Sequence, residues 1–225
     1  MPSVPDPALL LLLHDADGAA RCLKALAAAG LPEELVVVAG GAPAARATLD
    51  ELGGFLGARW LEGDGAALVN AAATALAGDL ILLDGATEVG PGFHAELLAV
   101  AAAEPDAATI TPLSNDAGFL SVPRRNLPWP LPSGGLTAAQ AAARLRAGAL
   151  GLHPRVPTAL PHATLLRRAA LQLAGPLDET LALRDALADF CARATAAGLA
   201  HVVADELFVA HRGAVPDGVA AGWTG

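Results

Sequence analysis

The stretch that decides the fold is "DLILLDGATEVGPGF", residues 79–93. A short run of Leu and Ile bounded by turn residues is typical of a strand that is buried on both faces of a parallel sheet. The run ends at a single carboxylate, Asp84, and the position two residues later is Ala86. A helical pattern follows from residue 92. The stretch therefore predicts a buried strand, a turn and a helix, which is the repeating unit of an α/β protein.

Similar units lie on both sides of this stretch. The predicted strands cover 8–14, 35–40, 58–63, 80–85 and 107–113. The predicted helices cover 18–30, a segment with Pro43 in its first turn, 65–78 and 92–105. Asp17 is expected to cap the first helix and Gly30 to end it. This alternation predicts an α/β fold with a Rossmann-like, mostly parallel sheet flanked by helices.

The pattern changes after Leu113. Residues 114–135 hold many Pro and Gly residues and almost no periodicity, so a long surface excursion is expected. A helix capped by Thr137 should follow, then an edge strand within 158–168, a helix over 181–198, and two short strands within 200–213. These make a smaller C-terminal mixed portion. We expect a single domain over 1–213 and a tail at 214–225.

The composition excludes several classes of protein. The net charge is −9, and no basic run exceeds a pair of arginines, so nucleic acid is not an expected partner. The longest strongly apolar run, "ALLLLL" at 8–13, is far shorter than the roughly 20 residues that span a bilayer. We therefore expect no transmembrane segment and a cytoplasmic location, where Cys22 and Cys191 would be buried free thiols.

Two nucleotide-binding loops can be tested against the sequence. The only lysine is Lys24, so the chain has no G-x-x-x-x-G-K-[ST] phosphate loop. In "VVVAGGAPAARA" the glycines Gly40 and Gly41 are adjacent and the third glycine position is Ala45, which does not fit the dinucleotide motif G-x-G-x-x-G. A tight turn between a strand and a helix is the better interpretation there.

The order of several blocks carries a more specific signal. These blocks are "LLLLLHDADGAARCLKAL", "ELVVVAGG", "GDGAALVNAAATALAGDLILLDGATEVGPGF", "AATITPLSN", "LLRRAALQLAGPLDE", "DFCARATAAG" and "FVAHRG". In this order and spacing, over residues 8–213, the chain resembles a bacterial family 2 glycosyltransferase of the GT-A fold. The resemblance implies a nucleotide-binding half at 1–113 and an acceptor half at 114–213.

The resemblance also implies a chemistry. Such enzymes transfer a sugar from a nucleotide-diphosphate sugar to an acceptor, usually with Mn²⁺ or Mg²⁺ held by an Asp-x-Asp motif after the fourth strand. A carboxylate base deprotonates the acceptor hydroxyl group. A further acidic residue after the second strand contacts the nucleotide base.

The sequence departs from that pattern at each of the three acidic positions. Asp84 matches the first motif position, but Ala86 replaces the usual metal ligand. Ala39 stands where the nucleotide-contacting acid is expected. In "LRDALADFCARA" the base position is filled by Ala186 and Leu187. A methyl group or an aliphatic side chain neither binds a hard cation nor accepts a proton.

Neighbouring residues offer partial substitutes. On the resemblance, the candidate catalytic residues are Asp185 and Asp189, the candidate nucleotide-sugar ligands are Asp84, Asn70, Arg168 and His211, and the candidate metal ligands are Asp84 and His211. Most of these residues have a simpler interpretation: capping of a turn for Asp84, a favourable interaction with the helix dipole for Asp185, backbone hydrogen bonding for Asn70, a solvated pair for Arg167 and Arg168, and an ordinary strand position for His211. His14 is expected to bond the next turn, and Trp129 either stacks on a sugar or pins its loop.

Two hypotheses remain open from the sequence. The first is a glycosyltransferase-like domain with lost or weakened catalysis, a pseudoenzyme that acts as a scaffold or regulator with a protein partner or as a homo-oligomer. The second is an active transferase, not dependent on metal, with relocated carboxylates. A cleft with at least two convergent carboxylates would favour the enzyme.

Overall fold

The strands of the first half are apolar because helices cover both faces of the sheet. In the computed structural model, which describes residues 6–133 and 135–212, all six residues of β1 (Ala8–Leu13) are buried. The odd-numbered leucines of β1 contact one helical layer and its even-numbered residues contact the other. This is the alternation that an extended strand imposes. The predicted α/β fold with a sheet between two helical layers is confirmed.

The sheet has eight strands within the described residues. Besides β1 these are β2 (Val37–Gly41), β3 (Arg59–Trp60), β4 (Leu80–Asp84), β5 (Thr87–Glu88), β6 (Ala107–Ser114), β7 (Ala163–Leu166) and β8 (Ala200–His211). Their order across the sheet is β3-β2-β1-β4-β7-β6-β8-β5. Strands β1 to β4 are parallel, β7 is antiparallel to both of its neighbours, β8 is parallel to β6, and β5 is antiparallel to β8.

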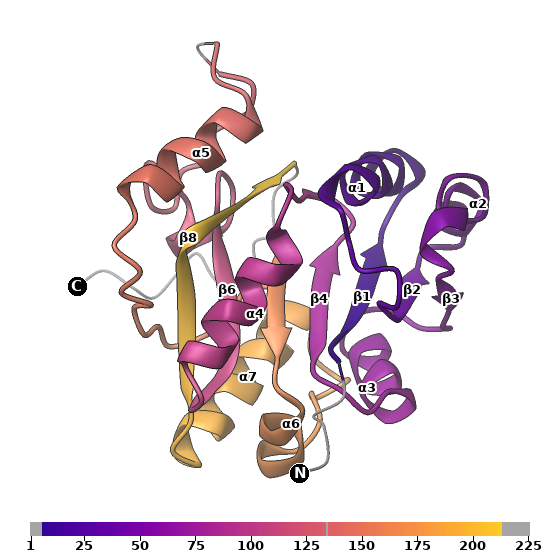
Figure 1. Ribbon diagram of the computed structural model, residues 1–225. Helices are drawn as coiled ribbons and strands as arrows, with labels where there is room; N and C mark the ends of the chain where they lie inside the picture. The colour runs from indigo at the N-terminus through magenta and orange to yellow at the C-terminus, as the bar shows by residue number, and fades with distance from the viewer. Residues whose placement is uncertain (1–5, 134, 213–225) are drawn as a thin grey trace.

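Seven α-helices surround the sheet in the described part of the chain (Figure 1). They are α1 (Ala16–Ala29), α2 (Pro43–Leu52), α3 (Gly65–Ala75), α4 (Phe93–Ala103), α5 (Ala138–Gly148), α6 (Arg168–Ala174) and α7 (Leu183–Ala196). Helices α1, α2 and α4 cover one face, and α3, α6 and α7 cover the other. Helix α5 packs against the end of β8. None of the helices within the described ranges has both the length and the apolar character that a membrane span requires.

Two predicted helix caps have different outcomes. The cap of α1 is Asp15 and not Asp17, because the Asp15 side chain accepts a hydrogen bond from the backbone N–H of Gly18 at 2.7 Å. Asp17 lies in the first turn, where a negative charge is also favourable. The predicted cap at Thr137 is confirmed, and Gln140 completes a reciprocal capping box with it.

Strand β7 is central, although the sequence predicts an edge strand in this region. It pairs with β4 on one side and β6 on the other, and all four of its residues are buried. The polar residue Thr164 is tolerated there because its hydroxyl group bonds the carbonyl oxygen of Ile110 at 3.1 Å and the hydroxyl group of Thr111 at 2.7 Å. The second predicted half of the chain therefore contributes to the middle of the sheet.

Strand β8 is one strand of twelve residues and not two short ones. Pro112 of β6 pairs with Ala204, and the next residue, Leu113, pairs with Phe208, so 205–207 form a bulge. A bulge lets a strand bend without ending. The end of β8 then pairs with the two-residue strand β5, which the sequence does not predict.

These pairings bring distant residues to one edge of the sheet. Parallel strands β1 and β4 end side by side, with Leu12 opposite Asp84. Thr87 of β5 is opposite His211 of β8, so the end of β8 is held next to the turn after β4. Ligands of open α/β sheets bind beyond the carboxyl ends of the strands. A ligand site is therefore expected where β1 and β4 end.

We expect Gly41→Ala to destabilise the fold by at least about 2 kcal/mol. Gly41 has φ 121°, and a Cβ atom there would lie 2.2 Å from the carbonyl oxygen of Leu13. Gly90→Ala is the matched control, because its added Cβ would meet no atom within 4 Å. Urea denaturation of both variants measures the difference, and equal midpoints would contradict the close approach of β1 and β2.

Candidate functional site

Asp84 is the last residue of β4, and its carboxylate is fully engaged by the protein. One oxygen, Oδ2, lies 2.8 Å from Nε2 of His14. The other, Oδ1, accepts a hydrogen bond of 2.7 Å from the backbone N–H of Ala86. The side chain is 17% exposed, so the group faces solvent at the strand ends without being freely solvated.

His14 follows β1 and forms an ion pair with Asp84. Its side chain is 58% exposed. The hydrogen bond with Asp84 raises the pKa of His14, and the charges of Asp84, Asp15 and Asp64 add to this against the opposing effect of partial burial. Burial alone would raise the pKa of the Asp84 carboxyl group, but the hydrogen bonds from His14 and His211 and the charge of His14 hold that pKa well below its usual range.

Two buried histidines lie behind this pair. Nε2 of His211 is 3.7 Å from Oδ1 of Asp84, and the His211 side chain is 4% exposed. The ring of His162 meets the ring of His211 edge to face, with centroids 6.4 Å apart. His162 donates from Nε2 to the carbonyl oxygen of Pro112 at 3.0 Å, and its Nδ1 is buried without a partner. Complete burial, with the charge of His211, lowers the pKa of His162 to about 3, so its ring is neutral.

The backbone of the turn after β4 is fixed from both sides. The N–H of Gly85 donates to the carbonyl oxygen of Leu12 at 2.7 Å, and the N–H of Asp84 donates to that of His162 at 3.1 Å. The hydroxyl group of Thr87 donates to the same His162 oxygen at 2.7 Å. The carboxylate of Asp84 is therefore carried by a rigid turn.

Asn115 joins the site to the loop that follows β6. Its Nδ2 donates to the carbonyl oxygens of His211 at 2.9 Å and of Trp129 at 3.1 Å. Its Oδ1 accepts from the N–H of His211 at 2.7 Å, and its own carbonyl oxygen accepts from the N–H of Trp129 at 2.8 Å. The side chain is buried. The predicted excursion over 114–135 is thus attached directly to the end of β8.

The two predicted catalytic aspartates lie on α7 in different surroundings. Asp185 is half-buried in the first turn. Leu183, at the start of the helix, lies next to Gly65, the first residue of α3, so this end of α7 is at the edge where the strands end. Asp189 is one turn further along, and its Oδ2 bonds the guanidinium group of Arg193 at 2.9 Å.

Asn70 and Arg168 are occupied by contacts within the fold. Asn70 Nδ2 donates to the carbonyl oxygen of Leu177 at 2.9 Å and to Glu179 at 2.8 Å. The guanidinium group of Arg168 bonds the carbonyl oxygen of Ala73, and its backbone N–H donates to Asp79 at 2.8 Å. Asp79 precedes β4, so Arg168 lies at the sheet edge opposite Asp84. The structure brings Asp84 and His211 together and separates them from Arg168.

The donors around Asp84 do not fit a hard divalent cation. Mn²⁺ and Mg²⁺ prefer several oxygen ligands, and Asp84 is the one carboxylate at this turn, since Ala86 supplies only a methyl group. Its two oxygens already accept hydrogen bonds from His14 and from Ala86. Within the described residues, the three-residue group with metal-ligand spacing is elsewhere, at His153, Asp205 and Glu206.

That second cluster is held by the bulge of β8. His153 lies 3.1 Å from Glu206 through Nε2 and 3.1 Å from Glu104 through Nδ1, and its backbone N–H donates to Asp205 at 2.9 Å. Burial opposes protonation of the ring, but the hydrogen bonds to Glu206 and Glu104 raise the pKa of His153. The sequence pattern does not predict this cluster, and its one signal is the pair of adjacent acids Asp205 and Glu206 inside a strand pattern.

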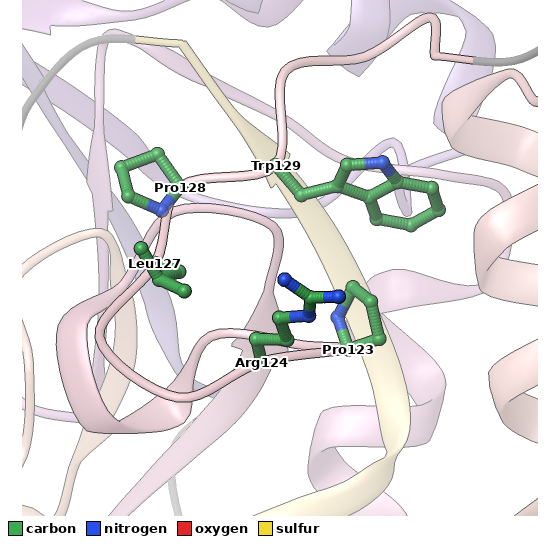
Figure 2. Close-up of a pocket in the computed structure, with 5 residues that line it drawn as sticks. All are labelled: Pro123, Arg124, Leu127, Pro128 and Trp129. Carbon is green, nitrogen blue, oxygen red and sulfur yellow. The ribbon is translucent and has the colours of Figure 1, made fainter.

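A pocket of about 350 Å³ opens in the loop that Asn115 anchors. Figure 2 shows its lining, which consists of Pro123, Arg124, Leu127, Pro128 and Trp129. All five belong to the predicted excursion. Of these five residues, Trp129 is the one that the sequence indicates as a candidate for sugar stacking.

Comparison with known proteins identifies the fold. No family model matches the chain, and no curated protein matches it. Solved structures do match, among them the crystal structure of GalNAc-T7 with UDP, GalNAc and Mn²⁺, with a TM-score of 0.65 at 14% sequence identity. The match covers 93% of this chain and 44% of that one, so this chain spans less than half the length of its neighbour. At this identity the likeness concerns the fold alone, and it confirms the predicted resemblance to the GT-A glycosyltransferase fold.

We expect the His162→Gln variant to lose less stability than the parent protein as the pH falls. In the folded protein His162 stays neutral down to about pH 3, whereas in the unfolded chain it binds a proton below about pH 6.5. Stability from this residue is therefore complete above pH 6.5 and falls as the pH drops towards 3, by up to about 1.4 kcal/mol per pH unit. Gln keeps a donor for Pro112 but does not titrate.

Urea denaturation of both proteins between pH 7.5 and 4.5 measures the effect. As the pH falls below 6.5, the free energy of unfolding of the parent protein should decrease relative to that of the variant by up to about 1.4 kcal/mol per pH unit. Parallel curves would show that His162 titrates normally in the folded protein.

Proposed function

We propose that this chain is a family 2-like glycosyltransferase domain that binds a nucleotide-diphosphate sugar at the Asp84 edge of the sheet, with lost or weakened catalysis. The GT-A fold supports the nucleotide-sugar part of the proposal. The lost or weakened catalysis is supported by the hydrogen bonds of both Asp84 oxygens to His14 and Ala86. A carboxylate that is already paired is a poor ligand for a bridging metal ion. The proposed role is that of a scaffold or regulator beside an active transferase.

Binding without a metal needs another source of positive charge near the diphosphate. His14 is exposed, and its pKa is raised by Asp84, so its imidazolium group is available at the strand ends. In this proposal His14 takes the place of the cation for binding. It does not provide the concentrated charge that stabilises a diphosphate leaving group during transfer.

Calorimetric titration with UDP, GDP and dTDP, with and without Mn²⁺, tests the proposal. We expect one of the nucleotides to bind with an affinity that Mn²⁺ changes by less than about threefold, because the turn from Asp84 to Ala86 offers one carboxylate, whose two oxygens are already hydrogen-bonded. Absence of binding by folded protein, or strictly Mn²⁺-dependent binding, would contradict it. His14→Ala should weaken metal-free binding.

Restoring the missing ligand provides a sharper test. We expect the variant His14→Ala with Ala86→Asp to bind UDP at least about tenfold more tightly with Mn²⁺ than without it, since Asp84 is released and a second carboxylate is added. His14→Ala with Ala86→Asn is the matched control, with the same shape but no added charge. Equal Mn²⁺ responses of the two variants would show that the turn after β4 is not the nucleotide site.

A second candidate is an active transferase that works without a metal. Asp185 favours this candidate, because it is a half-buried carboxylate at the start of α7. The start of α7 and Asp84 both lie at the end of the sheet where the parallel strands terminate. Asp189 is the weaker candidate, since Arg193 already binds its side chain.

If Asp185 acts as the base, Asp185→Asn should lower release of UDP from UDP-sugars by about 100-fold or more. The exposed Asp50→Asn on α2 is the control and should leave the rate unchanged. A rate that is zero for the parent protein as well would instead support the catalytically weakened domain.

A further inference from the structure

The pocket in the loop after β6 has the composition of a binding site for a small organic molecule. Four of its five lining residues are apolar or aromatic, and the fifth is Arg124. Ligand pockets are typically lined by apolar and aromatic groups with a few polar groups that fix the ligand's orientation. Nothing in the nucleotide site described above uses these residues.

Arg124 supplies a charge that the fold does not use. Its side chain makes no ion pair or hydrogen bond with any of the residues that the structure describes, whereas Arg146, Arg155 and Arg193 each bind a carboxylate. In Figure 2 its guanidinium group reaches into the space between Leu127 and the indole of Trp129. A planar guanidinium group offers paired donors that match a carboxylate or a phosphate.

Trp129 forms a wall of the pocket that is already in place. Asn115 holds its backbone through two hydrogen bonds, at 2.8 and 3.1 Å. Its side chain packs against the apolar cluster that contains Leu131 and Phe208. An aromatic ring held in this way loses little conformational freedom when a ligand stacks on it.

The pocket is connected to the nucleotide site through one residue. Asn115 binds the carbonyl oxygens of both Trp129 and His211, and the His211 ring lies beside Asp84. The backbone of one wall of the pocket is therefore tied to the end of β8, the strand that carries His211.

We propose that this pocket is a second sugar subsite, selective for an anionic sugar: a pyranose ring that carries a carboxylate or a phosphate group. The apolar C–H face of the ring stacks on Trp129 and contacts Pro123, Leu127 and Pro128, while Arg124 binds the anionic group. The placement beside a donor site rests on the proposed function, but binding in the pocket needs no catalysis. The chain as a whole has a net charge of −9, so selectivity for an anion has to come from a local cation such as Arg124.

The indole N–H resonances of the ¹⁵N-labelled chain of 225 residues give a direct test. The chain has three tryptophans, and Trp129→Phe identifies the resonance of interest. Titration with glucuronate, glucose 6-phosphate and glucose should shift the Trp129 signal saturably for at least one anionic sugar and far less for glucose. The first two probes distinguish a carboxylate from a phosphate. A Trp129 signal that does not move, or that responds equally to glucose, overturns the proposal.

Two matched variants assign the charge. Arg124→Gln should weaken binding of the anionic sugar by about tenfold or more, since it removes a charge-assisted hydrogen bond. Arg125→Gln removes the same charge from the adjacent exposed residue, which does not line the pocket, and should change the affinity by less than about twofold. Equal effects of the two variants would reduce the role of Arg124 to general attraction and overturn the subsite.

Calorimetry with UDP separates this inference from the proposed function. Arg124→Gln should leave nucleotide binding unchanged. Binding of an anionic sugar at Trp129 without any nucleotide binding would support the pocket and contradict the donor site. Nucleotide binding with no response of Trp129 would support the donor site and contradict the proposed sugar subsite.

Discussion

The pairing of β4 between β1 and β7 is the constraint on which the candidate site depends. The turn after β4 must pass so close to β1 that a Cβ atom at Gly85 would lie 2.8 Å from the carbonyl oxygen of Leu12. The N–H of Gly85 donates to that same oxygen. From the other side, β7 approaches through the residue before it, His162, whose carbonyl oxygen binds Asp84 and Thr87. These contacts hold the turn from both sides, and Asp84 in it pairs with His14.

The electrostatics of this edge are those of one carboxylate among three histidines. The exposed His14 is charged more readily because Asp84 is next to it. The buried His162 is held neutral by its surroundings. Such a set compensates the charge of Asp84 within the protein, whereas an Asp-x-Asp pair would carry uncompensated charge that attracts a cation. With a methyl group at Ala86 and His14 at the neighbouring strand end, the charge of Asp84 is thus balanced by groups of the protein itself.

Sequence patterns predict the strands that are buried along their whole length by apolar residues. They do not predict the position or extent of the strands, β7 and β8, whose polar residues are explained by neighbouring strands. The Leu-rich runs of β1 and β4 are recognisable because both of their faces are apolar. Strand β7 was misplaced because four residues that include Thr164 look like a strand half exposed to solvent, and only the hydrogen bonds to β6 explain them. The division of β8 into two strands was wrong for a related reason: Asp205 and Glu206 resemble a turn but form a bulge. For the site, the family resemblance and not the strand pattern grouped Asp84 with His211, because the strand that holds the end of β8 beside the turn after β4, β5, is not predicted. The contribution of His162 depends on the position of β7, and the loss of Asn70 and Arg168 from the site depends on side-chain contacts that no spacing reveals.

The outermost strands of the sheet, β3 and β5, have a consequence for how copies of this chain behave in a crowded solution. The strand at one edge, β3, has two residues, and Arg46 lies over the ring of its Trp60. At the other edge, β5 covers only the last residues of β8. The segment 154–156 lies along the start of β8, because the N–H of Val156 donates to the carbonyl oxygen of His201 and the N–H of Val203 donates to that of Pro154. Within the described residues the edges of the sheet are thus short or partly covered, which limits the backbone on which a neighbouring chain can add a strand. Short edges of this kind oppose the edge-to-edge aggregation to which apolar strands are prone.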